Sequence, residues 1–357
     1  MRKESLSFLQ KLVETPSPSG FEGPLQEVWL NRTAPFAEET RVDVHGNAMG
    51  ILNPEGRPRV MLAGHCDEIG FMVKYIADDG FISFAPIGGV DINIVPARRI
   101  FIHSSSGPVP GVIGKKPIHL MDPATRASQK LEWHALWIDI GVSSRKEAEK
   151  LVSLGDPITF TDGFSRLAGD MVVGRGFDDK MGSFVVSEVV RILSGKKIKA
   201  ALFSVSTVQE ELGLRGAKTS AHGIDPDVGI AVDVTFSSDH PDVDKKQIGE
   251  ITMGKGPVVA RGANINPRVF DGIIKTAKSS KIECQIEPSP RATGTDANVI
   301  QLTRSGVATG VVSVPNRYMH TPVEMISLKD LENAARLLAD YVQSLKPEDS
   351  FLPFEVK

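Results

Sequence analysis

The chain has 357 residues, of which 41% are hydrophobic and 24% charged, and its formal net charge is -3. This length suits about two domains, and the weak negative charge excludes the basic footprint of a nucleic-acid-binding protein. Its two cysteines, Cys66 and Cys284, are too few for a disulfide framework. Because no apolar stretch is as long as a membrane span and the N-terminus lacks the apolar core of a signal peptide, we expect a soluble, cytoplasmic protein without a membrane partner.

The predicted elements begin with an N-terminal helix, on which Leu6, Leu9, Leu12 and Val13 share one face. Nearly uninterrupted aliphatic runs, typical of parallel strands covered on both faces, occupy 60–64, 200–206, 228–234 and 306–314. The periodicity of amphipathic helices recurs over 181–195, 268–278 and 330–345. Strands alternating with helices predict an α/β fold, a mixed sheet flanked by helices.

A different pattern runs from residue 70 to residue 165. It is rich in glycine, proline and short strand-like runs, and it has helical periodicity only over 144–155. These features predict a small β-rich domain, inserted because α/β patterns lie on both sides of it. We therefore expect one α/β domain of residues 1–69 and 166–357, and a β-rich insert of residues 70–165. Residues 119–132 are polar and irregular, which predicts a loop.

Histidines and carboxylates follow these four apolar runs and a fifth, "GDMVVGRGF" (169–177). Open α/β sheets bind ligands in the crevice at the carboxyl ends of their strands, so these side chains are expected at one edge of one sheet. Each motif alone has a simpler interpretation, such as a solvated strand end for the glutamates or a helix cap for the aspartates. If no metal site existed, all of these simpler interpretations would have to apply together at the same edge of the sheet. The residues are His65, Asp67, Asp178, Asp179, Glu210, Glu211, Asp233 and His320.

The chemistry of this set points to metal ions. Nitrogen and oxygen donors without thiolates suit a catalytic Zn, Co or Mn site better than a structural zinc site. Two metals about 3.5–4 Å apart need one shared carboxylate and two or three further ligands each, and the count of residues matches. Asp67 is then expected to accept the ring N–H of His65 and fix its tautomer.

Glu210 and Glu211 place two like charges side by side. In extended backbone adjacent side chains point apart, so Glu211 can bind a metal while Glu210 accepts the proton of a water molecule. Two cations would also offset the repulsion between the carboxylates.

The motifs "GHCDEIGFMV", "GRGFDDKMG", "VSTVQEELGLRGA", "GTDAN" and "NRYMHTP" resemble those of the tetrahedral (TET) aminopeptidases, a co-catalytic metallopeptidase family that includes glutamyl and deblocking aminopeptidases. The match runs over nearly the whole chain. The resemblance implies a dinuclear zinc exopeptidase-like fold and two divalent ions per subunit, Zn or Co, with Mn also possible. Lys180 stands where family members commonly have arginine.

The resemblance also implies residue roles. His65 and Asp233 would hold one metal and Glu211 and His320 the other. Asp178 would bridge them, in preference to Asp179, with a cis peptide following it. Glu210 would be the general base, with Asp67 beside it. The candidate substrate contacts are Arg291, Thr295 and Asp296, although Arg291 fits slightly better as an ordinary surface charge.

In the family an insert at this position drives dimerisation and assembly into a hollow tetrahedral dodecamer, and the loop at 119–132 is similar to one that reaches a neighbouring subunit's active site. Trp133 and Trp137 lie in the insert, and aromatic residues are enriched in interface cores. The expected partners are therefore peptide substrates and further copies of the chain.

Three other functions stay open from the sequence. A carboxypeptidase or deacylase could use the same dinuclear scaffold, although the position of the insert argues against it. An endoglucanase would use two carboxyl groups flanking one bond, but would leave the two histidines without a role. A non-catalytic assembly protein would have no need of a complete ligand set.

Overall fold

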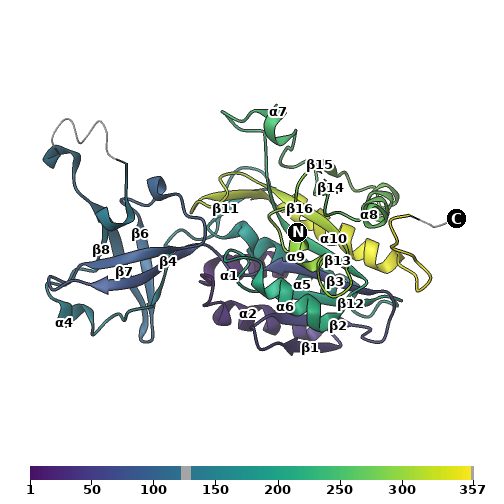
Figure 1. The fold of residues 1–357 in the computed structure, drawn as a ribbon, viewed down its shortest axis with the longest axis horizontal. Helices are drawn as coiled ribbons and strands as arrows, with labels where there is room; N and C mark the ends of the chain where they lie inside the picture. The colour runs from purple at the N-terminus through teal and green to yellow at the C-terminus, as the bar shows by residue number, and fades with distance from the viewer. Residues whose placement is uncertain (122–129, 355–357) are drawn as a thin grey trace.

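The computed structural model describes residues 1–121 and 130–354 and has two parts that lie side by side (Figure 1). The larger part is an eight-stranded sheet with helices on both faces, and the smaller part is a closed antiparallel barrel. The predicted fold class, a mixed α/β sheet with a small β-rich domain inserted into it, is confirmed.

The large sheet has its four predicted strands at the centre. β3, β12, β13 and β16 are parallel to their central neighbours, and antiparallel pairs join β1 to β2, β2 to β12 and β14 to β16. In spatial order the strands are β1 (Glu39–Val42), β2 (Ala48–Leu52), β12 (Ala201–Thr207), β3 (Arg59–His65), β13 (Val228–Phe236), β16 (Ala308–Asn316), β14 (Val258–Gly262) and β15 (Gln285–Ser289).

Burial on both faces explains the uninterrupted aliphatic runs. In β3, Val60 and Leu62 belong to the core on one face of the sheet, whereas Met61 and Ala63 belong to the core on the other. Successive side chains of a strand point to opposite faces, so a central strand needs apolar residues at every position.

Helices cover both faces of this sheet (Figure 1). The three predicted long helices and two N-terminal helices bury their apolar stripes in the larger core, and α6 and α9 cover the opposite face. The helices of the larger core are α1 (Lys3–Glu14), α2 (Gly23–Thr33), α5 (Phe177–Leu193), α8 (Pro267–Ser279) and α10 (Leu328–Ser344). The others are α4 (Arg145–Ala148), α6 (Arg215–Ile224), α7 (Lys245–Ile248) and α9 (Ala297–Ile300).

The barrel has its own core of aliphatic and aromatic side chains. Its strands all lie inside the predicted insert, and the run 144–155 is helical only over Arg145–Ala148. Of the predicted loop 119–132, residues 122–129 lie outside the described residues. In order around the barrel the strands are β4 (Gly70–Ile76), β5 (Ile82–Ile87), β8 (Leu136–Asp139), β7 (Gly107–Lys115), β6 (Arg99–Ser104) and β9 (Pro157–Phe160).

A small three-stranded sheet follows the barrel where the chain returns to the α/β part. Its strands are antiparallel, and the sequence pattern did not predict them. They are β10 (Ser165–Arg166), β11 (Met171–Gly174) and β17 (Glu324–Ser327). No helix within the described ranges is both long enough and apolar enough to cross a lipid bilayer.

Two glycines let β3 and α5 approach closely. A Cβ on Gly64 would lie 2.6 Å from the carbonyl oxygen of Gly182, so any larger residue there would push the helix away from the strand. This close approach brings the start of α5, with Asp178, against the end of β3, with His65.

A buried charge cluster joins the two connections between the sheet and the barrel. Glu68, on the outgoing connection, contacts Arg175 on the return connection and lies 2.8 Å from Nζ of Lys180. Burial alone would raise the pKa of Glu68, but the two cations outweigh it and hold that pKa at about 2. Lys180 also donates to the carbonyl oxygen of Thr15 (2.8 Å), so the end of α1 belongs to the same junction. We call these three charged residues the junction cluster.

Candidate metal centre

His65 is the last residue of β3, and its ring is fixed at Nδ1. This nitrogen lies 3.1 Å from the carbonyl oxygen of Asp67 and 3.4 Å from its carboxylate. The carbonyl oxygen and the carboxylate of Asp67 therefore both face Nδ1 of His65. The carboxylate was the expected neighbour of this nitrogen, and the carbonyl oxygen is a second one. A carbonyl oxygen can only accept, so Nδ1 carries a proton and Nε2 is the nitrogen that faces the crevice.

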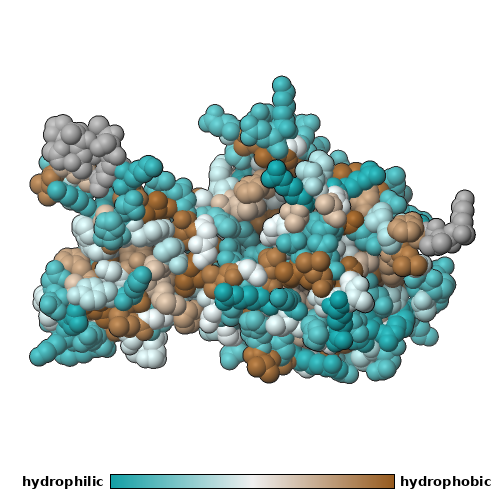
Figure 2. Space-filling view, in the orientation of Figure 1, coloured by the Kyte–Doolittle hydropathy of each residue, from teal (hydrophilic) through white to brown (hydrophobic). Residues whose placement is uncertain are grey.

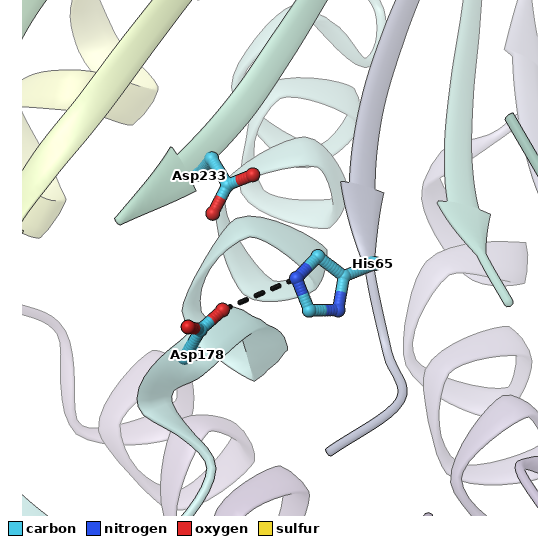
Figure 3. A group of neighbouring side chains, drawn as sticks. All are labelled: His65, Asp178 and Asp233. Atoms are coloured by element: carbon cyan, nitrogen blue, oxygen red, sulfur yellow. Dashed lines mark ion pairs between the residues drawn. The ribbon is translucent and has the colours of Figure 1, made fainter. Parts of the chain in front are cut away.

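Asp178 lies between the two histidines. Its Oδ1 is 3.2 Å from Nε2 of His65, and its Oδ2 is 3.2 Å from Nε2 of His320. Figure 3 shows the first of these contacts, with Asp233 on the neighbouring strand. The Asp178–Asp179 peptide is cis. The Asp179 carboxylate instead accepts the backbone N–H groups of His65 and Gly182, both at 3.0 Å, and so faces away from the histidine rings.

His320 follows β16 and is held by a residue of the barrel part. Its Nδ1 lies 2.9 Å from the carbonyl oxygen of Gly89, in the segment after β5. As in His65, this contact places a proton on Nδ1, so Nε2 is the nitrogen that faces the crevice, here 3.2 Å from Oε1 of Glu211. The insert therefore helps to orient a candidate ligand, a contact that the sequence did not predict.

The two adjacent glutamates reach different histidines, but strand alternation is not the reason. β12 ends at Thr207, and Gln209 has a φ of 54°, so Glu210 and Glu211 lie in a turn and the expectation of extended backbone is wrong. Their backbone N–H groups donate to the two oxygens of Asp67, at 3.0 and 3.2 Å. This anchor sends Glu211 toward His320 and places Oε2 of Glu210 3.8 Å from Nε2 of His65.

Two groups of donor atoms share Asp178. Within each group the candidate ligand atoms lie within 4.8 Å of one another. One group is His65, Asp178 and Asp233, and the other is Asp178, Glu211 and His320. We call these five residues the donor cluster.

The charges in this crevice call for cations. Burial raises the pKa of Glu210 to about 10 and that of Asp233 well above its ordinary range. The hydrogen bonds of His320 with Asp178 and then Glu211 raise its pKa to about 11. Carboxylates so crowded must take up protons or share cations. Metal ions can replace the protons held on the two Nε2 atoms that face the same space, so the donor cluster fits a pair of divalent metal ions.

Glu324 is a supporting residue that the sequence analysis missed. It is buried, and its carboxylate accepts the backbone N–H of Asp178 and that of His320, both at 2.9 Å. One side chain thereby fixes the backbone of two members of the donor cluster. Its place four residues after His320 was the only signal in the sequence.

A cavity of about 540 Å³ opens from the donor cluster. Of the three candidate substrate contacts, Thr295 lines it. Asp296 is buried behind it and accepts the hydroxyl of Thr207 at 2.6 Å, and the exposed Arg291 is not among the lining residues. The part of the chain that the structure describes contributes no lysine or arginine to this lining.

A mixed α/β sheet with two histidines at or beyond the carboxyl ends of its strands, and a carboxylate at the start of α5 shared between them, is the arrangement of a metal-dependent hydrolase of the exopeptidase type. The chain belongs to the M42 glutamyl aminopeptidase family, whose family model matches residues 46–337. It is thus an enzyme of a metallo-aminopeptidase family, and the resemblance drawn from the motifs is confirmed.

Individual relatives match over nearly the whole chain. Lysyl aminopeptidase of Pyrococcus furiosus is 38% identical, covering 96% of this chain and 98% of its own. The crystal structure of a TET aminopeptidase from a marine sediment archaeon of the Thaumarchaeota superposes with a TM-score of 0.92 at 34% identity, covering 97% of both chains. The TET1 peptidase of Pyrococcus horikoshii, which can assemble into a tetrahedron or a large octahedral shell, has a TM-score of 0.85 at 32% identity, covering 96% of this chain and all of its own.

Proposed function

We propose that this protein removes N-terminal amino acids from peptides with the help of two divalent metal ions. His65 and Asp233 would hold one ion, Glu211 and His320 would hold the other, and Asp178 would be shared by both. The observation that carries the proposal is the position of Asp178, whose two oxygens each face the Nε2 atom of a different histidine at 3.2 Å. Zn and Co suit these donors best, and Mn is also compatible.

Divalent ions in this position supply Lewis-acid chemistry, because they polarise a carbonyl group and lower the pKa of water. The protein supplies the base. Glu210 is not a member of the donor cluster, yet its carboxylate lies 3.8 Å from the Nε2 atom of His65, so it is placed to take a proton and pass it to the leaving amine. Asp67 positions this machinery, since it holds the His65 ring and the backbone of both glutamates.

The cavity favours an aminopeptidase over a carboxypeptidase. A carboxypeptidase needs a cation to hold the α-carboxylate of its substrate, and the described lining offers neither lysine nor arginine. Its carboxylates suit a free α-ammonium group instead. In an aminopeptidase the two histidines of the lining would bind metal ions, whereas an endoglucanase would leave them without a role.

The test compares one peptide in three forms: free, N-acetylated and C-amidated. We expect the free and amidated forms to lose their first residue, and the acetylated form to resist, as followed by mass spectrometry. Release of the last residue from the free peptide would instead identify a carboxypeptidase, and release of acetate would identify a deacylase. Cleavage of cellulose that survives a chelator would support the endoglucanase.

We further propose that the barrel drives dimerisation and assembly into a tetrahedral dodecamer. The tetrahedral assembly of the Pyrococcus horikoshii relative supports this. So do exposed apolar residues of the barrel part, and Figure 2 shows brown patches there in one view. They include Tyr75, Phe81, Val112, Ile118, Leu120, Leu151 and Leu154. Trp133 is not among them, because it packs against Phe71 and Phe84 inside the barrel.

Light scattering should therefore give a mass near twelve times the 38.6 kDa of the chain, or a dimer that assembles further as concentration rises. Replacing Val112, which is 48% exposed, by aspartate should shift the distribution toward smaller species. The matched control is Val44→Asp, at a fully exposed position outside the barrel. A wild-type protein that stays monomeric at micromolar concentration would contradict the proposal.

A further inference from the structure

One carboxylate in the cavity forms no ion pair with any residue that the structure describes. Glu287, on β15, lines the cavity, and both of its oxygens lie 3.0 Å from the hydroxyl of Thr235, which can donate to only one of them at a time. Across the described residues no lysine, arginine or histidine forms an ion pair with it. The other unsatisfied carboxylates of this cavity belong to the donor cluster or to Glu210, so Glu287 stands apart from the metal chemistry.

The surroundings of Glu287 leave its charge uncompensated. Burial raises the pKa of this carboxyl group, and the Thr235 hydroxyl opposes that rise only in part. A partly buried anion without a counter-ion is costly, and a cation that enters the cavity removes this cost. The cavity therefore favours a ligand with a positive charge at this end.

The position of Glu287 along the sheet sets the length of that ligand. Thr235 follows Asp233 by two residues in β13, so both side chains lie on the same face of the sheet, roughly 7 Å apart along the strand. Glu287 is bonded to Thr235 and so marks a point about this far from the donor cluster. An extended lysine side chain spans roughly 6 Å from Cα to Nζ, since it has five single bonds of about 1.5 Å.

Apolar side chains contribute to the cavity walls alongside several hydroxyl and amide groups. Ala260, Val311 and Met319 line the same cavity as Glu287. Such side chains pack against methylene groups, while a carboxylate at the far end takes the charged head. This combination matches a long aliphatic side chain with a terminal cation.

We propose that Glu287 determines substrate specificity and that the enzyme prefers peptides with an N-terminal lysine or arginine. This rests on the proposed aminopeptidase function and adds the substrate class. The same carboxylate repels an N-terminal glutamate or aspartate, and no lysine or arginine in the described lining offsets this repulsion. Acidic first residues are accordingly the poorest substrates, even though the family takes its description from glutamyl aminopeptidase.

The test compares four aminoacyl substrates with one chromogenic leaving group: lysyl, arginyl, norleucyl and glutamyl. Norleucine has the carbon chain of lysine without the ammonium group, so the lysyl-to-norleucyl ratio of kcat/KM isolates the charge. We expect this ratio to be about 10–100 in the wild type, the range of a hydrogen bond to a charged group, and to fall to near one in Glu287→Gln. Glu287→Lys should reverse the order and favour the glutamyl substrate.

The matched control is Glu283→Gln, which removes the same charge at an exposed position that does not line the cavity, and should keep the wild-type ratio. Glu287→Asp retains the charge but places the carboxylate one methylene further back, so this variant should favour the longer arginyl substrate over the lysyl one. It provides the test of the inference if Glu287→Gln does not fold. A wild-type ratio of one or less, or a ratio that Glu287→Gln leaves unchanged, overturns the inference while the aminopeptidase function stands. Failure to release any of the four amino acids overturns the proposed function itself.

Discussion

Replacing Glu210 by glutamine is expected to lower kcat by about 10²–10⁴-fold while the bound metal stays at the wild-type level. Glutamine has nearly the same shape but cannot accept a proton from water. Glu210 lies near His65 without belonging to either group of candidate ligands, so metal binding does not depend on it. Turnover of an aminoacyl substrate and metal content by elemental analysis, both on the same sample, measure the two effects.

Glu211→Gln is the matched control, because it makes the same change one residue further along the chain. Its carboxylate is a candidate ligand at 3.2 Å from the Nε2 atom of His320, and a neutral amide binds a divalent cation more weakly. This variant should lose metal from one site, and excess metal should partly restore its activity. If Glu210→Gln loses metal and Glu211→Gln does not, the two roles are exchanged. If both variants keep metal and full activity, the catalytic centre lies elsewhere.

Removing divalent metal with a chelator is expected to abolish peptide hydrolysis, and added Zn or Co to restore it. The donor cluster has three carboxylates for two histidines, with Glu210 beside it, and without cations this charge is balanced only by protons. Metal should also raise the melting temperature, because a ligand that binds only the folded state stabilises it. Activity and thermal unfolding, followed while each metal is titrated into the stripped enzyme, measure both effects.

Asp178→Asn sharpens this experiment. Asp178 belongs to both groups of donors, whereas Asp233 and Glu211 each belong to one. The Asp178 variant should therefore bind metal weakly at both sites, and the Asp233→Asn and Glu211→Gln variants at one site each. Full activity in a sample that elemental analysis shows to be free of metal would rule out a dinuclear mechanism.

The centre of the sheet could be predicted because its strands are apolar at every position. β3, β12, β13 and β16 are buried on both faces, so tertiary packing and local pattern agree. The edges could not be predicted in this way. β1 is exposed along its whole length, and β15 alternates between half-buried and exposed residues and includes Pro288. Neither has the aliphatic run that marks a buried strand.

The same contrast holds for the site. Four members of the donor cluster could be foreseen because they lie at or beyond the carboxyl ends of predicted parallel strands, which meet at one edge. Asp178 instead follows β11, a strand of the small antiparallel sheet. The sequence predicted that the side chains of Glu210 and Glu211 diverge, but it attributed this to extended backbone. A turn anchored on Asp67 produces the divergence instead. Glu287 was missed because it lies on an edge strand, and Gly89 because it approaches His320 from 231 residues away in the chain.

The contact between Gly89 and His320 links the two parts of the molecule energetically. The carbonyl group of Gly89 orients a candidate metal ligand, and the junction cluster fixes the connections on which the barrel is mounted. If the proposed second subunit packed against this segment of the barrel part, it would also steady the ring of His320. Thermodynamic linkage is reciprocal, so metal bound at the crevice would strengthen subunit association by the same factor by which association strengthens metal binding. A shell of such subunits would then favour its own metal-loaded members, and the assembled particle would be the form in which the enzyme best retains its ions.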